Sequence, residues 1–367
     1  MRVLVRAPFN RYSGYGNDGV DIVRWLDRVG VDVYPWPINF MPGVPEDFAK
    51  LLTKKPRRGS DAYDVTLTFA PPFDIRVSER SSKMIRQPGL PKNIARVHVG
   101  WSMWEQTKLT RDHMRGHGVG RSPWKHLTWM YATSQVSISA FMHYEPRVEY
   151  RLLPCGIDGD LYPFAKRGVS GPTRFCMVGE LHVRKDPYLA IEAFHQLKRE
   201  KGADFDAELH LKTTVRGLPK QLESVVDGLY VHDDWWTYER LIRWMQDMHC
   251  YVGPSRGEGN LKPPMEFMAT GGTVIVTNWS GPENWLHRDV GYPLNYRLGP
   301  VHPGEEDGPM EAKADLDHLK QLMWHVHTNR VEASRKGMLA AEWIRKVASW
   351  ERIVRRAVRD FQEALDS

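Results

Sequence analysis

The sequence predicts an α/β protein made of two halves, each a parallel sheet covered by helices. Strand-like apolar runs alternate with helix-like amphipathic runs along the chain, which is typical of parallel sheets with helices on both faces. This series starts a second time after the stretch 168–172, which contains two glycines and a proline. The length of 367 residues also suits two domains of ordinary size.

The first half opens with an apolar run, 2–7, that we expect to form a strand. A turn rich in small residues, 8–17, follows it. A helix is expected next, because apolar residues recur at helical spacing before Gly30: Val20, Val23, Leu26 and Val29. Three further strands are expected at 31–36, 63–69 and 94–101.

The second half repeats the alternation at higher density. Strands are expected at 173–179, 207–213, 250–255 and 273–278. Helices are expected at 187–200, 238–248 and 264–271. The tail 340–365 predicts one long amphipathic helix, because its apolar residues lie roughly on one face: Ile344, Val347, Val354, Val358, Phe361 and Leu365.

The composition is that of a soluble globular protein, with 41% apolar and 26% charged residues. No apolar run approaches the roughly 18 residues of a membrane span, and the start reads as a strand rather than a signal peptide. Three widely spaced cysteines, Cys155, Cys176 and Cys250, predict reduced thiols and a cytoplasmic location. The net charge of +6 permits an anionic partner without requiring one.

The stretch 253–272, GPSRGEGNLKPPMEFMATGG, places Glu258 and Glu266 eight positions apart around two prolines. Glycines flank the first glutamate, and small residues let backbone N–H groups approach a ligand closely. The second glutamate lies near an expected helix start, where free N–H groups favour anions. A surface turn with two solvated carboxylates is the alternative. The position of the stretch favours a ligand site, because it lies beyond a predicted strand end.

Four stretches resemble the motifs of one family. The stretch 254–272 is similar to the E-x7-E region, EGFGLPxLEAMAxG, of the retaining, GT-B-fold glycosyltransferases of family 4 (group 1 glycosyltransferases). It keeps seven residues in register: Glu258, Gly259, Pro263, Glu266, Met268, Ala269 and Gly271. The stretch 178–186 resembles the GRLxxxKG phosphate motif, with Gly179, Leu181 and Lys185 in place. The stretches 152–164 and 99–109 resemble the PxGVDxxxF element and the YTMWExxxIP loop.

The resemblance covers about residues 1–300 and implies the fold. It implies two Rossmann-like domains facing across a cleft, with a C-terminal helix that crosses back to the first domain. We expect an acceptor-side domain at 1–167, a nucleotide-sugar-binding domain at 168–340 and the C-terminal helix at 341–367.

The resemblance also implies roles for residues of the second domain. Glu266 is expected on the donor ribose, where a carboxylate accepts two hydroxyl protons. Glu258 is expected on the hydroxyls of the donor sugar. Lys185 is expected to stabilise the leaving diphosphate by its positive charge. Backbone N–H groups of three consecutive residues are expected to add donors: Gly259, Asn260 and Leu261.

The chain departs from the family pattern at Glu180, which stands where the family has an arginine. A carboxylate cannot neutralise a diphosphate, so another cation must supply the missing charge. The candidates are Arg184, Lys262 and Arg256, of which we place Arg184 in the expected donor site. Asn260, Leu261 and Lys262 replace the usual Phe-Gly-Leu, which predicts an unusual sugar pocket.

Five residues of the first half enter the expected site. Gly14 and Gly16 lie in a turn whose backbone is expected to approach the donor phosphates. His98 is expected to line the cleft at a strand end as a catalytic group, or else to be a packed strand histidine. Trp104 and Glu105 are expected on the acceptor side, although a loop-end carboxylate can instead cap a helix.

Two further patterns each allow a purely structural and a functional interpretation. The D-x-D pairs at 158–160 and 204–206 lack accompanying metal-site motifs, so we expect no metal and no cofactor, with the nucleotide sugar as a substrate. Three tryptophans gather in 233–244. Core packing is the default for them, and stacking of Trp235 or Trp236 on a base or a sugar ring is the alternative.

The expected activity is transfer of a sugar from a nucleotide-diphosphate donor to a hydroxyl acceptor, which can be a glycan, a protein or modified DNA. One alternative is a glycosyltransferase acting on hydroxymethylated DNA bases. Another is a non-catalytic nucleotide- or carbohydrate-binding protein on a GT-B scaffold. Four basic residues lie in 53–61: Lys54, Lys55, Arg57 and Arg58. They either form a solvated cluster without a partner or contact a polyanion.

Overall fold

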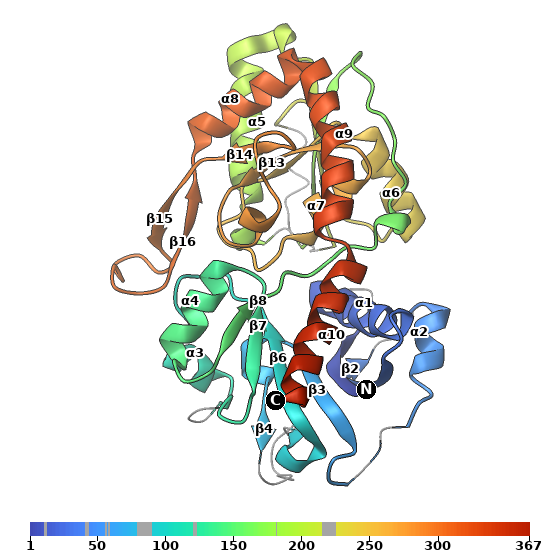
Figure 1. The fold of residues 1–367 in the computed structure, drawn as a ribbon. Coiled ribbons are helices and arrows are strands. Elements are labelled where there is room, and N and C mark those ends of the chain that lie inside the picture. The colour runs from blue at the N-terminus through green and yellow to red at the C-terminus, as the bar shows by residue number, and fades with distance from the viewer. Residues whose placement is uncertain are drawn as a thin grey trace. The chain divides into compact units, whose positions relative to one another are not determined.

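The computed structural model divides into two compact units. It describes residues 1–10, 13–40, 44–55, 57, 59–78, 90–119, 123–180, 182–214 and 225–367, with no side-chain description for 39 and 40. The first unit comprises Met1–Gly156 and Ala348–Ser367, and the second comprises Ile157–Val347. Figure 1 shows the two units and labels many of their elements.

The first unit is built on a parallel sheet of six strands. Its order is β2-β1-β3-β6-β7-β8. The strands are β1 (Arg2–Phe9), β2 (Asp32–Phe40), β3 (Tyr63–Phe69), β6 (Ala95–Ser102), β7 (Trp129–Ala132) and β8 (Tyr150–Leu152). A short parallel pair is formed by β4 (Val77–Ser78) and β5 (Leu90–Pro91). The helices are α1 (Gly14–Arg28), α2 (Glu46–Leu51), α3 (Arg111–Gly116), α4 (Gln135–Tyr144) and α10 (Trp350–Asp366), with 3-10 turns η1 (Pro72–Asp74) and η2 (Lys92–Ile94).

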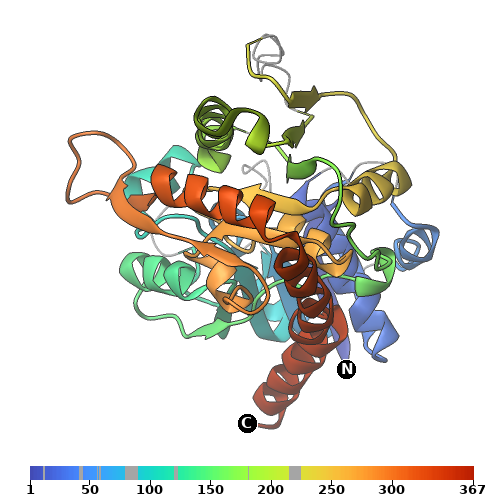
Figure 2. The same ribbon diagram turned by 90° about the horizontal axis from the view of Figure 1, so that it is seen from above.

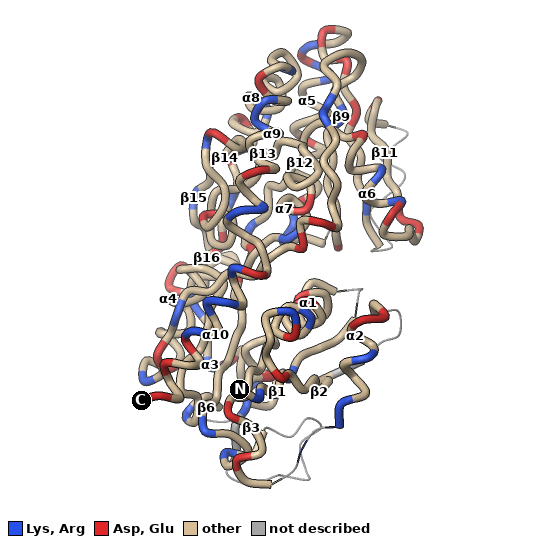
Figure 3. Tube along the Cα trace, turned by 45° about the vertical axis from the view of Figure 1, so that its right-hand side comes forward, with Lys and Arg blue, Asp and Glu red and all other residues tan. Residues whose placement is uncertain are grey.

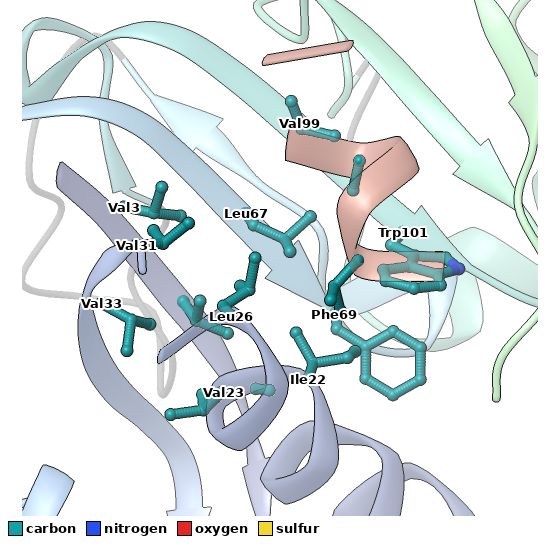
Figure 4. Close-up of a cluster of buried hydrophobic side chains, with 14 of the residues drawn as sticks. Val3, Ile22, Val23, Leu26, Val31, Val33, Leu67, Phe69, Val99 and Trp101 are labelled. Atoms are coloured by element: carbon teal, nitrogen blue, oxygen red, sulfur yellow. The ribbon is translucent and has the colours of Figure 1, made fainter. Parts of the chain in front are cut away.

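The main core of the first unit lies between its sheet and the helices α1 and α10. Alternate residues of β1 face this core, because strand side chains point to opposite faces in turn, and Val3 and Val5 are fully buried there. Figure 4 shows the side chains of Ile22, Val23 and Leu26 on α1 facing the strands. The helix starts at Ser13, whose hydroxyl accepts from the Gly16 backbone N–H at 3.0 Å.

The second unit repeats the architecture. Its six parallel strands have the order β11-β10-β9-β12-β13-β14. The strands are β9 (Thr173–Val178), β10 (Ala207–Lys212), β11 (Leu229–His232), β12 (Cys250–Gly253), β13 (Thr273–Thr277) and β14 (Tyr292–Leu294). The helices are α5 (Pro187–Lys201), α6 (Tyr238–Asp247), α7 (Lys262–Ala269), α8 (Leu316–Thr328) and α9 (Arg330–Val347), with 3-10 turns η3 (Gly159–Leu161), η4 (Val183–Lys185), η5 (Gly202–Asp204) and η7 (Gly281–Asn284).

The second unit also carries an antiparallel hairpin that the sequence analysis did not predict. Its strands are β15 (Tyr296–Pro300) and β16 (Met310–Ala314). Figure 2 shows the loop of this hairpin, in orange, extending away from the six-stranded sheet. Tyr296 and Leu298 on β15 are exposed, whereas Glu311 and Ala312 on β16 are buried. The strand β16 is therefore the side of the hairpin that joins the body of the unit.

A buried arginine ties together three parts of the second unit. The Arg167 guanidinium donates to the carbonyls of Met245 (3.0 Å) and Met248 (2.6 Å) at the end of α6. It also donates to the carbonyl (2.8 Å) and hydroxyl (2.6 Å) of Thr270 at the end of α7 and to the Ala165 carbonyl (2.6 Å). Burial lowers the pKa of Arg167 to about 10, which leaves the side chain charged at neutral pH. A cation at two helix C-termini is favoured by both helix dipoles.

The tail forms two helices where the sequence pattern predicted one. The helix α9 ends at Val347, and α10 begins at Trp350, with the Ser349 hydroxyl accepting from the Arg352 N–H at 3.2 Å. Ser349 has an extended backbone (φ −69°, ψ 134°), which interrupts the helix and starts a new one. Trp350 and Phe361 are fully buried in the first unit, and the Tyr131 hydroxyl donates to Asp360 at 2.5 Å. The expected return of the C-terminal helix to the first domain is thus confirmed, and the single continuous helix is wrong.

Candidate functional site

Three loops of the second unit follow neighbouring strands of its sheet. The segments 179–186, 254–261 and 278–284 come after the carboxyl ends of β9, β12 and β13, which are adjacent in the sheet. Ligands of open α/β sheets bind beyond this edge. Leu181, one of the motif residues, lies outside the described residues.

The structure brings three of the predicted donor-site residues into one charged cluster, formed by Arg184, Lys185 and Glu258. Lys185 Nζ lies 2.6 Å from Glu258 Oε1, and Arg184 Nη1 lies 3.1 Å from Glu258 Oε2. Arg184 also donates to the Gly257 carbonyl. The glutamate side chain is only 7% exposed, against 13% for the lysine and 29% for the arginine. The cluster therefore has a buried carboxylate and a more accessible cationic side.

The carboxylate of this cluster is held in its ionised form. Burial raises the pKa of Glu258, but the charges of Lys185 and Arg184, with hydrogen bonds from Lys185 and Ser255, outweigh burial and lower the pKa below its usual value. Burial and the same two cations lower the pKa of His182. At neutral pH the cluster thus contains two cations and one anion, beside a neutral imidazole.

The backbone of the loop that carries Glu258 accepts hydrogen bonds from the segment after β13. The Gly281 N–H donates to the Glu258 carbonyl at 2.9 Å, and the Trp285 indole N–H donates to the Asn260 carbonyl at 3.2 Å. A Cβ atom on Gly281 would lie 2.7 Å from Asn260 backbone atoms, so only glycine fits there. This support was not predicted from the sequence. Its available signal was the S-x-x-E pattern of Ser280 and Glu283, which form a capping box.

Leu261, rather than a glycine, takes the left-handed backbone conformation in this loop. Its φ is +60° as the N-cap of α7, and its side chain is buried. A left-handed conformation costs a non-glycine residue about 1–2 kcal/mol, and such strain is often found at functional sites. Asn260 beside it is also buried. The residues that replace the usual Phe-Gly-Leu of the family thus form a tightly packed entry to α7.

Glu266 lies in the second turn of α7 and is half-buried. The two glutamates of the motif share one neighbour, Tyr251 on β12. Burial raises the pKa of Tyr251, and the charges of Glu258 and Glu266 raise it further. The Tyr251 hydroxyl donates to the Val178 carbonyl at the end of β9, at 3.4 Å. The charges of both glutamates therefore act on a tyrosine whose hydroxyl lies at the end of β9.

The three candidates for the missing family arginine differ in their surroundings. Arg184 belongs to the charged cluster. Lys262 is the first residue of α7 and is half-buried. Arg256 pairs with Asp186 at 2.8 Å and with Glu311 at 3.6 Å. Two carboxylates thus surround the Arg256 charge within the second unit.

In the first unit, the two predicted glycines lie in the first turn of α1. A Cβ atom on Gly16 would lie 2.3 Å from side-chain atoms of Asn10. Asn10 in turn accepts from the Ser13 N–H at 2.9 Å, so Gly16 makes room for a local turn. A Cβ atom on Gly14 would meet nothing within 4 Å among the described atoms. Gly14 is thus the more open of the two.

His98 lies inside β6 rather than at a strand end, which corrects the expected placement. It is paired with Thr66 on β3 and is 4% exposed. Its Nδ1 lies 2.7 Å from the Thr66 hydroxyl, and its Nε2 lies 2.8 Å from the Lys92 carbonyl. Burial lowers its pKa. Both ring nitrogens are engaged by the protein, so we do not retain His98 as a catalytic candidate.

Trp104 and Glu105 follow β6 in the first unit. Trp104 is buried, its backbone N–H donates to the Ser137 hydroxyl at 3.0 Å, and its indole N–H donates to the Lys108 carbonyl at 2.9 Å. Glu105 is half-buried. Burial raises the pKa of Tyr15, and the charge of Glu105 raises it further. The tryptophan therefore shapes this loop, and the charge of the glutamate acts on Tyr15 in the first turn of α1.

Two of the basic residues in 53–61 contact side chains of the first unit. Lys54 pairs with Asp32 at 3.3 Å, and the Arg57 guanidinium lies over the Tyr34 ring, whereas Arg58 lies outside the described residues. The helix α10 carries both signs of charge (Figure 3), and its four arginines lie between Glu351 and Asp360.

The two neighbouring tryptophans of the second unit differ in burial. Trp236 contacts the rings of His232 and Trp244 and lies under Lys212 and Arg240, whereas Trp235 is 71% exposed.

The described residues form neither a candidate metal site nor a helix that could span a membrane. Among them, no three His, Cys, Asp or Glu side chains are grouped so that they could hold a metal ion. Among the same residues, no helix has the length and apolar character needed to cross a membrane.

Comparisons with known proteins place this geometry in context. Residues 172–296 match the family model of Glycosyl transferases group 1. No curated protein sequence matches the chain.

Solved structures resemble the chain at low sequence identity. Sucrose-phosphate synthase from Thermosynechococcus elongatus has a TM-score of 0.66 and 14% identity, over 99% of this chain and 98% of that chain. Anabaena Alr3699/HepE, in complex with UDP and glucose, has a TM-score of 0.63 and 12% identity, over 99% and 100%. TarM has a TM-score of 0.58 and 11% identity, over 81% of this chain and 54% of that chain, so the match spans about half the length of TarM.

These likenesses establish the fold, and the family model identifies the segment that carries the charged cluster. The chain therefore has the GT-B fold, with two Rossmann-like units, and contains a group 1 glycosyltransferase domain at residues 172–296.

Proposed function

We propose that this protein is a retaining, metal-independent glycosyltransferase of the hexosyltransferase type. It transfers a sugar from a nucleotide-diphosphate donor to a hydroxyl acceptor. The observation that carries the proposal is the charged cluster of Arg184, Lys185 and Glu258, with Nζ–Oε1 and Nη1–Oε2 distances of 2.6 and 3.1 Å. It lies at the ligand edge of the sheet, inside the segment that matches the group 1 family model.

In the proposed reaction, the two cations of the cluster stabilise negative charge on the leaving diphosphate. This charge grows as the glycosidic bond breaks, and preorganised cations lower the barrier by binding it most strongly in the transition state. Glu258 accepts hydrogen bonds from the sugar hydroxyls, and Glu266 accepts them from the ribose. Because side chains and backbone dipoles supply the stabilisation, no divalent metal is required.

Release of nucleoside diphosphate from a panel of nucleotide sugars tests the proposal. UDP-glucose is the first donor to try, because the structures of HepE contain UDP-glucose. The wild-type chain should hydrolyse at least one donor, and Lys185→Gln should lower turnover by about 10²-fold, as expected for the loss of one preorganised charge. The exposed Lys166→Gln in the same unit is the matched control for Lys185→Gln.

The outcomes separate the proposal from its alternative. A wild-type chain that binds nucleotide sugars but hydrolyses none in the presence or absence of acceptor would be a binding protein on this scaffold. Adding a glycan, a protein and a hydroxymethylated DNA in parallel identifies the acceptor class. NMR of the product then reports the anomeric configuration, and inversion would contradict the retaining assignment.

A further inference from the structure

Arg256 connects three segments of the second unit through its side chain and its backbone. Its Nε donates to Asp186 Oδ2 at 2.8 Å, and its Nη1 lies 3.6 Å from Glu311 Oε1 on β16. Its backbone N–H donates to the Arg184 carbonyl at 2.8 Å, and its carbonyl accepts from the Ala312 N–H at 2.7 Å. A single residue thus joins the segment 182–186, its own loop and the β15–β16 hairpin.

Two of these three segments carry the charged cluster, and the third contacts them through Arg256. The segment 182–186 carries Arg184 and Lys185, and the loop of Arg256 carries Glu258 two residues later. The segment ends at Asp186, which has a left-handed backbone (φ 50°, ψ 52°) as the N-cap of α5. The Asp186 carboxylate accepts no capping hydrogen bond from the backbone of α5. It accepts a hydrogen bond from Arg256 instead. The ion pair therefore holds a backbone turn that local preference disfavours.

The charges show which role Arg256 can have. Two carboxylates, Asp186 and Glu311, lie against its guanidinium. Lys185 and Arg184, by contrast, share the single carboxylate of Glu258. An anionic ligand thus meets excess positive charge at the cluster and a neutralised charge at Arg256.

We propose that Arg256 is a positioning residue for the charged cluster, and that the β15–β16 hairpin braces the site through it. Arg256 fixes Arg184 and Lys185 relative to Glu258 and does not bind the diphosphate. This inference rests on the proposed function for its catalytic consequence. Its structural part stands on the contacts alone.

The planar guanidinium suits this role because it presents donors in two directions, whereas a lysine ammonium is a single point charge. Arg256→Lys therefore keeps the charge and loses the two-sided bridge, and Arg256→Gln loses both. Arg240→Gln is the matched control, because Arg240 pairs with Asp234 at 3.2 Å in the same unit and both side chains are more than half exposed.

The first measurement is steady-state turnover with the donor found in the hydrolysis panel. Both Arg256 variants should lower kcat at least tenfold and change KM for the donor less than threefold. Arg240→Gln should leave both constants at the wild-type values. Wild-type kcat in Arg256→Lys would overturn the positioning role.

The second measurement is calorimetric binding of inorganic pyrophosphate. The dissociation constant should change less than threefold in Arg256→Gln and increase at least tenfold in Lys185→Gln. A tenfold loss of pyrophosphate affinity in Arg256→Gln would make Arg256 a direct anion ligand and overturn the inference.

The third measurement is amide hydrogen exchange, which needs no turnover and no nucleotide. Exchange in peptides covering 183–190 and 310–314 should become at least tenfold faster in Arg256→Gln, while α8 stays at the wild-type rate. Unchanged exchange in both peptides would overturn the inference. If the wild type hydrolyses no nucleotide sugar, the proposed function fails, and hydrogen exchange still decides whether Arg256 holds these segments.

Discussion

Replacing Glu258 by glutamine should make the chain bind pyrophosphate more tightly while it transfers sugar more slowly. The substitution keeps the shape of the side chain and removes its negative charge. In the structure this carboxylate holds Lys185 at 2.6 Å and Arg184 at 3.1 Å. An incoming diphosphate therefore competes with Glu258 for the same two cations.

The size of the effect follows from these distances. A phosphate oxygen about 2.8 Å from Lys185 on its open side would lie roughly 5 Å from the Glu258 carboxylate, given the 2.6 Å ion pair. At an effective dielectric constant of about 20, two unit charges at that separation repel by roughly 3 kcal/mol. Two effects reduce this gain. Water near the partly exposed Arg184 screens the charges, and the glutamine positions Arg184 and Lys185 less firmly than the carboxylate does. We expect a net gain of about 1.4 kcal/mol, which is tenfold in the dissociation constant.

Titration calorimetry with pyrophosphate and with UDP measures this change directly. Turnover of the donor should fall in the same variant, because the glutamate contact with the sugar hydroxyls is lost. Glu192→Gln controls for the general effect of removing a negative charge from the second unit. Equal or weaker pyrophosphate binding by Glu258→Gln would refute the reasoning, since it would show that the carboxylate does not compete with anions.

Four further predictions follow from the same geometry. Glu266→Ala should weaken donor binding by about 1.5–3 kcal/mol, the usual loss for a hydrogen bond to a charged group, and unchanged donor affinity by calorimetry would remove the ribose assignment. Donor hydrolysis should persist in excess chelator, and activity that is abolished and then restored by manganese or magnesium would point to the D-x-D pairs. Because the folded-state pKa of Glu258 is lowered, its ionised form contributes stability that is present above its ordinary pKa of 4.5 and is lost as the pH falls through the folded-state pKa. The difference in unfolding free energy between wild type and Glu258→Gln should therefore shrink below about pH 4.5, and a constant difference from pH 7 to pH 3 would contradict the lowered pKa. Arg167→Met should destabilise the second unit by at least about 3 kcal/mol, because it leaves several buried carbonyls without donors. The exposed Arg297→Met should cost far less, and similar thermal unfolding of the two variants would contradict the role of Arg167.

The fold class and the main elements could be predicted because they depend on local patterns. Apolar runs such as 173–179 and helical spacing in α1 record burial directly in the sequence. The hairpin β15–β16 escaped prediction because β15 is largely exposed and lacks an apolar pattern. The break at Ser349 escaped because the apolar spacing continues across it, whereas a single capping hydroxyl decides the local conformation.

The candidate site could be predicted in part for the same physical reason. The motif resemblance selected Glu258 and Lys185, and the structure brings them together at 2.6 Å. The role of Arg256 could not be read from the sequence, because its partners lie 70 residues before it and 55 residues after it. His98 is the packed strand histidine that the sequence analysis gave as one of two interpretations, because it lies in the middle of β6 with both ring nitrogens engaged. The other interpretation, a cleft-lining histidine, required a position at the end of the strand.

The packing of α10 into the first unit has a consequence for how the chain is made. The first unit needs Ala348–Ser367 as well as Met1–Gly156, and Trp350 and Phe361 complete its core. Chains emerge from the ribosome from the N-terminus onward, and domains usually fold in that order. Here the second unit, Ile157–Val347, is complete first, while the β1–α1 layer lacks its covering helix until residues 348–367 have been synthesised. The N-terminal sheet therefore closes after the second unit has been synthesised, and its apolar face stays accessible to chaperones during that interval.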